Sequence, residues 1–142
     1  MSRAVLDTDI LSEVLKRKDQ RVVACAHEYL AAHTRLTITV VSVLEVVAGW
    51  HRRQREDRVA QFLTLLAEID VLPVDTEAAV LAGRIEADLA RLGRSVGRAD
   101  SMIAAVASTR GLPLVTGNGD HYARIRDLGV ALELDDWRAP RA

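Results

Sequence analysis

The sequence predicts an α/β fold, a three-layer α/β/α sandwich with a central parallel sheet. Short apolar or β-branched segments, typical of strands, alternate along the chain with longer segments whose apolar residues recur at helical spacing. Strands that are separated by helices pair in parallel, and the helices then cover both faces of the sheet. The chain has 142 residues, of which 49% are hydrophobic and 27% charged, so a single domain over residues 1–142 is expected.

The first half of the chain is expected to contain two strands and four helices. Residues 4–6 form a short apolar strand that ends at Asp7, and the strand at residues 36–39 is rich in β-branched side chains. Apolar residues at helical spacing place the four helices at residues 10–18, 22–33, 41–52 and 55–68.

The second half is expected to contain three strands and three helical segments. The strands are placed at residues 69–74, 114–116 and 130–134. Asp75 is a favourable N-cap for a helix that reaches about residue 92, and an alanine-rich helix over residues 99–110 ends at a glycine. A turn at residues 117–119 precedes a helical turn over residues 122–127.

The composition excludes several classes of protein. The formal net charge is −1, and no apolar run approaches the roughly 20 residues that a membrane helix requires. No apolar secretory segment follows Arg3, so a cytoplasmic location without membrane contact is expected. The single cysteine, Cys25, excludes an internal disulfide and a thiolate metal cluster, and a small buried side chain is expected there.

The basic residues are almost all arginines, and they gather in two clusters. These are Arg52, Arg53, Arg55 and Arg58 in one cluster and Arg91, Arg94 and Arg98 in the other. Arginine suits bidentate contact with phosphate, although a solvated helix face is the simpler interpretation of either cluster alone. Aromatic residues make up 4%, so a nucleic acid would be bound through its phosphates and shape. Trp50 and Trp137 are expected to anchor the core or an interface.

Four acidic residues stand where a ligand site is expected. Ligands of parallel sheets bind beyond the carboxyl ends of the strands, where Asp7 and Asp120 follow two of the strands. Each of these two alone also suits a turn or a cap. Glu45 interrupts a nearly apolar helix, where an unpaired carboxylate costs several kcal/mol. Its small neighbours favour a cleft at that position, and the alternative is a buried ion pair with an arginine.

Asp100 opens the alanine-rich helix, where the helix dipole alone would favour an acid. If the four acids converge, their mutual repulsion requires a cation, and hard oxygen ligands select Mg²⁺ or Mn²⁺. Such an ion polarises a phosphoryl oxygen and activates water, which suits phosphodiester hydrolysis beside arginines.

These residues, taken in order, resemble the motifs of the PIN-domain ribonucleases, and most closely the VapC-type toxins of bacterial toxin–antitoxin pairs. The motifs are VLDTDILS at residues 5–12, Glu45, Asp100 with the apolar residues 103–105, and VTGN at residues 115–118. The order of the set is more specific than any one motif, and the resemblance extends along nearly the whole chain.

The resemblance implies an Mg²⁺- or Mn²⁺-dependent endoribonuclease that cuts RNA with an activated water and no covalent intermediate. Asp7, Glu45 and Asp100 would form its acidic core, with Asp7 and Asp100 as the metal ligands. The hydroxyl of Thr116 would support the site. It also implies a homodimer and a small cognate antitoxin, which would bring a basic side chain to the acidic pocket.

The fourth acid departs from the family pattern. Asn118 stands where many relatives carry an acid, and Asp120, two residues later, is the candidate for that charge. His121 and Tyr122 stand where the family often has Asp-Phe. Asp9 is expected to act behind the metal ligands or as a helix cap.

Two alternative functions remain. In an aspartyl-nucleophile phosphatase of the haloacid-dehalogenase type, Asp7 would be the nucleophile and Asp9 the acid. That family needs a late basic residue, usually lysine, yet the last lysine here is Lys18, and Glu45 would have no role. The other alternative is a non-catalytic RNA- or protein-binding relative, which would have no reason to keep Glu45 on an apolar face.

Overall fold

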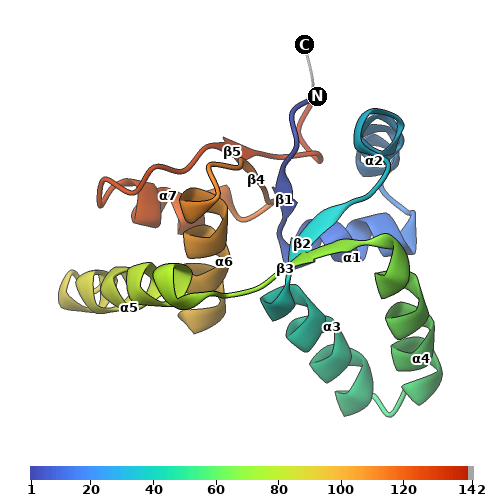
Figure 1. Ribbon diagram of the computed structural model, residues 1–142, viewed down its shortest axis with the longest axis horizontal. Coiled ribbons are helices and arrows are strands. Elements are labelled where there is room, and N and C mark those ends of the chain that lie inside the picture. The colour runs from blue at the N-terminus through green and yellow to red at the C-terminus, as the bar shows by residue number, and fades with distance from the viewer. Residues whose placement is uncertain (141–142) are drawn as a thin grey trace.

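The computed structural model describes residues 1–140, and its five strands are all parallel to their hydrogen-bonded neighbours. The strands are β1 (Val5–Leu6), β2 (Thr37–Thr39), β3 (Asp70–Leu72), β4 (Leu114–Val115) and β5 (Leu134–Asp135). One ladder has the order β1-β4-β5 and the other pairs β2 with β3. β1 and β2 are in contact, so the two ladders lie side by side in the middle of the molecule (Figure 1).

Helices lie on both sides of these strands. The helices are α1 (Thr8–Lys16), α2 (Gln20–His33), α3 (Val40–Arg52), α4 (Glu56–Leu65), α5 (Thr76–Arg91), α6 (Arg98–Thr109) and α7 (Gly119–Arg126). In Figure 1, α5, α6 and α7 lie to one side of the strands, and α1, α2 and α4 lie to the other. The prediction of an α/β sandwich with a parallel sheet is confirmed.

Strand alternation divides the apolar side chains between two cores. Successive strand residues point to opposite faces, so Leu6 and Val115 pack with α1 and α2, whereas Val5 and Leu114 pack with α5, α6 and α7. All four side chains are at most 1% exposed. The strands are therefore short but buried on both faces, as expected for parallel strands between helical layers. Cys25 on α2 is buried, as expected from the sequence.

Three predicted elements differ from those observed. The last strand is β5 rather than residues 130–134. The two residues of β4 pair with Leu134 and Asp135, and Leu132 is buried in the core with α5, α6 and α7. The predicted turn at residues 117–119 leads directly into α7, because the carbonyl of Asn118 accepts hydrogen bonds from the next turn. The helix predicted at residues 55–68 is α4 followed by a 3-10 helix (Leu66–Glu68).

Each of four helices begins at a side chain that accepts a backbone hydrogen bond. The capping residues are Asp7 for α1, Asp19 for α2, Thr39 for α3 and Asp75 for α5. Asp75 was expected in this role. Asp7 both follows β1 and caps α1, so two elements hold its backbone. Within residues 1–140, none of the helices combines the length and apolar character needed to span a bilayer.

Candidate active site

Asp7 lies at the carboxyl end of β1 and is held by β4 and α1. Its backbone N–H donates to the carbonyl of Val115 at 2.8 Å. One carboxylate oxygen accepts from the N–H of Thr8 at 2.8 Å, and the other accepts from the hydroxyl of Thr116 at 2.8 Å. The Asp7 residue is only 5% exposed. The carboxylate therefore has a fixed orientation before any ligand binds.

The charge on Asp7 is unfavourable in the protein alone. Burial is the main cause that raises the pKa of Asp7, to about 7, and the nearby charges of Asp9 and Asp100 raise it further. Its hydrogen bonds from Thr116 and Thr8 offset only part of this effect. A cation beside Asp7 would relieve the same repulsion, so the environment suits a carboxylate that ligates a metal ion.

Asp100 lies in the first turn of α6, and α7 contacts both of its carboxylate oxygens. The hydroxyl of Tyr122 donates to Oδ1 at 3.3 Å, and Nδ1 of His121 lies 3.3 Å from Oδ2. Tyr122 is fully buried, and burial, followed by the charges of Asp7 and Asp100, raises its pKa. Its hydroxyl therefore keeps its proton beside the two carboxylates. Tyr122 was not predicted to belong to the site, because a buried tyrosine at helical spacing resembles any core aromatic residue.

Glu45 on α3 is connected to α1 by a hydrogen bond from the Thr8 hydroxyl, which also contacts the hydroxyl of Ser42. The hydroxyl of Thr8 donates to Oε1 of Glu45 at 2.6 Å and lies 2.8 Å from the hydroxyl of Ser42. A hydroxyl has a single proton, so Ser42 donates to Thr8. No arginine within residues 1–140 forms an ion pair with Glu45, which removes the alternative of a buried ion pair. Glu45 is thus connected to Asp7 through the adjacent residue.

The carboxylates that could hold a metal ion are those of Asp7 and Asp100. In the described part of the chain, no three His, Cys, Asp or Glu side chains stand close enough to share one ion. Mg²⁺, however, commonly uses one or two carboxylates and keeps several of its waters. The carboxylate oxygens of Asp7 and Asp100, which both interact with the buried Tyr122 hydroxyl, are suitable ligands for such an ion.

The side chains of Asn118 and Asp120 do not join this group. Both residues are exposed at the start of α7. The Asn118 contact with the site is made by its backbone N–H, which donates to the Thr116 hydroxyl at 2.9 Å. The side chain of Asp120 forms no hydrogen bond or ion pair with residues 1–140. The assignment of Asp120 as the fourth acid therefore stays a prediction.

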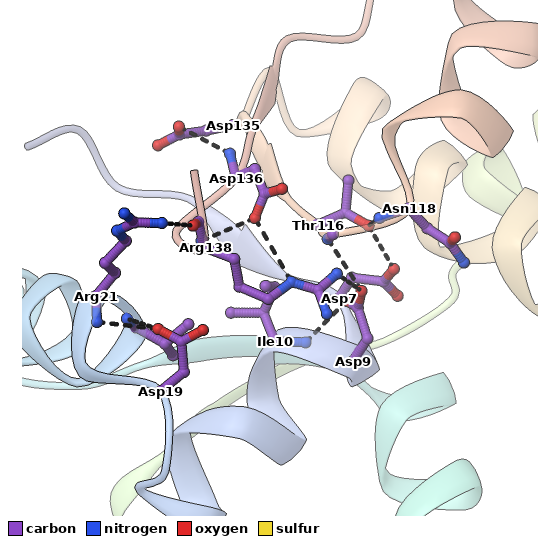
Figure 2. A network of polar contacts seen from close by, with 12 residues as sticks. Asp7, Asp9, Ile10, Asp19, Arg21, Thr116, Asn118, Asp135, Asp136 and Arg138 are labelled. Atoms are coloured by element: carbon purple, nitrogen blue, oxygen red, sulfur yellow. Dashed lines mark hydrogen bonds and ion pairs between the residues drawn. The ribbon is translucent and has the colours of Figure 1, made fainter. Parts of the chain in front are cut away.

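A second network, centred on Asp9, lies next to Asp7 (Figure 2). One oxygen of Asp9 accepts from the N–H of Gly117 at 2.9 Å and from the guanidinium of Arg138 at 3.2 Å. Arg138 also bonds through its backbone N–H to Asp136 at 2.8 Å. Asp7 is the N-cap of α1, so Asp9 does not have the capping role that was one of its two expected roles. Asp9 binds the loop that follows β4.

Gly117 leaves room for the Arg138 guanidinium in this network. A Cβ atom at residue 117 would lie 1.2 Å from that guanidinium, so with any other residue the end of the Arg138 side chain would have to move. The position of Gly117 in a predicted turn was the one sequence signal for this contact. Arg138 gives no comparable signal, because it follows the last strand in a segment without periodicity.

The model of the PIN domain family matches residues 4–128 of the chain. The chain belongs to the PIN-domain family. Among relatives, the chain is 34% identical to the tRNA(fMet)-specific endonuclease VapC of Shigella flexneri and 30% identical to that of Salmonella typhimurium. Each alignment covers 96% of this chain and 99% of the relative.

Solved structures agree with this membership. The chain superimposes with a TM-score of 0.79 and 30% identity on a chain of DNA-bound VapBC from Salmonella typhimurium, covering 96% of this chain and 99% of that chain. The VapC-type PIN identity predicted from the ordered motifs is therefore confirmed. Arg138 lies beyond the matched residues 4–128, so the Asp9 network joins the family core to the segment that follows it.

Proposed function

We propose that this VapC-type chain is an endoribonuclease, the toxic component of a toxin–antitoxin pair, which hydrolyses RNA phosphodiester bonds with Mg²⁺ or Mn²⁺. The observation that supports it most is the placement of Asp7 and Asp100 around the buried Tyr122 hydroxyl at the carboxyl end of β1. The identity to relatives named tRNA(fMet)-specific endonucleases gives the substrate class, RNA.

Each residue of the site has a chemical role in this proposal. Asp7 and Asp100 would hold the divalent ion, which when bound polarises the phosphoryl oxygen and acidifies water. Thr116 and the Thr8 N–H keep the Asp7 carboxylate oriented, which lowers the cost of ordering it on binding. Tyr122 keeps a proton at its hydroxyl and donates it in a hydrogen bond to Asp100.

In this proposal Glu45 would accept the proton of the attacking water. Its carboxylate is half-buried, has no cationic partner in residues 1–140, and has one oxygen held by Thr8. A carboxylate held at one oxygen can take up a proton at the other. Asp120, exposed at the start of α7, would add negative charge beside His121 and Tyr122, which contact Asp100.

The proposed partners are a small antitoxin and a second copy of the chain. The Salmonella typhimurium relative was solved as a VapBC complex bound to DNA. A basic side chain of an antitoxin would be attracted to Asp7, Glu45 and Asp100 and would compete there with the divalent ion. Co-expression with the neighbouring short gene, followed by sizing of the purified complex, tests both partners.

The decisive experiment uses purified protein with transfer RNA and other structured RNA. Cleavage is expected with Mg²⁺ or Mn²⁺, and it should disappear with EDTA and in Asp7→Asn and Asp100→Asn. Glu28→Gln, an exposed change on α2, is the matched control and should cleave normally. Full cleavage in EDTA, or in both site variants, would refute the metal-dependent mechanism.

The phosphatase alternative has less support from the geometry. It needs Asp9 as a free acid, yet Asp9 accepts from Gly117 and is paired with Arg138. Activity toward small phosphate esters without RNA cleavage would favour it over the proposed ribonuclease.

A further inference from the structure

A groove of about 730 Å³ extends from the candidate active site between α1, α3 and α4. Thr8 and Glu45, which are hydrogen-bonded to each other, line it at the active site. Apolar side chains that include Val46 and Phe62 also line it. In Figure 1, α3 and α4 form a helical hairpin beside α1. Residues of these three helices line the groove. The groove is thus continuous with the residues next to Asp7.

The groove is lined by cations that have no acidic partner. These cations are Lys16, Lys18, Arg52, Arg53 and Arg58. Glu45 is the acidic residue of the lining. Within residues 1–140, none of the five cations has a carboxylate oxygen within 4.0 Å, although carboxylates neutralise many arginines elsewhere on the surface. The groove is therefore strongly positive, and a polyanion would release counterions when it binds there.

The second arginine cluster, in contrast to these groove cations, is ion-paired. Arg91 pairs with Asp88, Arg94 pairs with Asp127 at 3.3 Å, and Arg98 pairs with Glu86 at 3.0 Å. The two clusters look equivalent in the sequence. In the structure, the second cluster is an ion-paired helix surface. In the first cluster Arg55 pairs with Asp57 at 2.8 Å, and the groove-lining Arg52, Arg53 and Arg58 have no acidic partner within residues 1–140.

Two of the groove arginines are held in place by an aromatic ring. The guanidinium carbons of Arg53 and Arg58 lie 5.3 Å and 5.5 Å from the centroid of the Trp50 ring. Cation–π contact restricts these long side chains but leaves their N–H groups available for phosphate oxygens. Trp50 thus orders the two guanidinium groups and is itself half-buried.

We propose that this groove binds the sugar–phosphate backbone of the RNA strand next to the bond that is cut, an inference that rests on the proposed ribonuclease function. An RNA chain continues on both sides of the cut bond, so the surface leading away from Glu45 must accommodate flanking nucleotides. Cations stand on α1 and on the α3–α4 hairpin, so both walls contact a phosphate chain lying between them. Binding through phosphates is also what the low aromatic content favours.

The test measures RNA binding without cleavage, in EDTA, by the anisotropy of a fluorescent single-stranded RNA over a series of NaCl concentrations. The groove variant is Arg52→Gln with Arg53→Gln and Arg58→Gln. The matched control is Arg91→Gln with Arg94→Gln and Arg98→Gln, which removes the same charge. For the groove variant we expect an RNA affinity at least about tenfold lower. The slope of log affinity against log salt concentration should decrease in magnitude by about 2, because each phosphate that an arginine no longer neutralises removes about 0.7. The control should keep the wild-type slope, and circular dichroism checks the folding of both.

Three outcomes would overturn the groove as the RNA site. They are an unchanged affinity of the groove variant, an equal loss in both triple variants, and a groove variant that binds RNA normally but no longer retains a co-expressed antitoxin. The last outcome would assign the groove to a protein segment. If the triple groove variant does not fold, the single variant Arg58→Gln is measured over the same NaCl series, with Arg94→Gln as its control.

Failure of the groove and failure of the proposed function give different results. Normal cleavage by wild type and groove variant alike would reject the groove and keep the ribonuclease. Groove-dependent RNA binding by a wild-type protein that cuts no RNA in Mg²⁺ or Mn²⁺ would support the groove and reject the ribonuclease. Absence of RNA binding in EDTA together with absence of cleavage in Mg²⁺ or Mn²⁺ by the wild type would reject both.

Discussion

The hydroxyl of Tyr122 donates to Asp100 at 3.3 Å, and the same phenol is close enough to Asp7 for both charges to raise its pKa. One neutral donor from α7 therefore acts on carboxylates that come from α6 and from the end of β1. Within residues 1–140, no arginine or lysine forms an ion pair with either carboxylate.

The Tyr122→Phe change should lower activity more than it lowers stability. Losing the donor to Asp100 should reduce kcat/KM by about tenfold, since a buried hydrogen bond to a charged group contributes about 1.5 kcal/mol. Tyr29→Phe is the matched control, because its buried hydroxyl bonds to Ala4 on the other side of the fold. Both variants should lose similar stability in urea, and only Tyr122→Phe should lose activity per folded molecule. Equal activities would show that the Tyr122 hydroxyl has only a structural role.

The raised pKa of Asp7 predicts that stability without metal falls as pH rises. The folded protein favours protonated Asp7, so this contribution is fully present below the ordinary value of 3.8 and is lost as pH rises through about 7. In EDTA at pH 8, the free energy of unfolding of Asp7→Asn should exceed that of wild type by at most about 4 kcal/mol, because a shift of one pKa unit corresponds to about 1.4 kcal/mol. The difference should vanish near pH 4.

Urea unfolding of wild type, Asp7→Asn and Glu28→Gln over this pH range measures that effect. Adding Mg²⁺ at pH 8 should raise the melting temperature of wild type and have little effect on Asp7→Asn, since a ligand stabilises the state that binds it. A wild-type protein whose stability is constant from pH 4 to pH 8 would contradict the prediction.

Glu45→Gln should reduce the rate of cleavage and leave the fold intact. The amide oxygen still accepts from Thr8, but the amide cannot take up a proton, so a loss of about 100-fold or more in kcat is expected. Thr8→Val separates the roles, because it keeps the Glu45 carboxylate and removes the hydroxyl that orients it. Single-turnover cleavage of both variants provides the measurement. A Glu45→Gln protein with normal kcat would exclude Glu45 as the proton acceptor.

Arg138→Gln should impair the site although the residue lies beyond the matched family residues. Asp9 would keep its bond from Gly117 but lose the neighbouring positive charge. The pair is partly exposed, so stability should change by less than about 1 kcal/mol. Cleavage should fall several-fold as the loop after β4 loosens. Arg21→Gln is the control, since Arg21 contacts only the carbonyl of Arg138 in that segment. Equal activities in the two variants would count against a positioning role for Arg138.

Local patterns in the sequence predicted where Asp7 and Glu45 stand relative to the strands and helices. Asp7 follows an apolar strand, and strand ends of a parallel sheet meet at one edge, so its location followed from the alternation of strands and helices. Glu45 interrupts an apolar helix flanked by small residues, and its face does line a groove. Apolar periodicity indicates which face of a helix or strand is buried. For Asp7 and Glu45, the face on which the residue lies determines the environment of its side chain.

Tertiary contacts decided what local patterns do not encode. Tyr122 belongs to the site because α7 packs against α6, and Arg138 because the chain after β5 crosses the loop at Gly117. In the second arginine cluster every guanidinium has a carboxylate partner, whereas in the first cluster, within residues 1–140, only Arg55 has one. The apolar pattern around a residue indicates which face of its helix or strand it occupies. The charges that surround its side chain depend largely on groups that are distant along the chain and become neighbours only after folding.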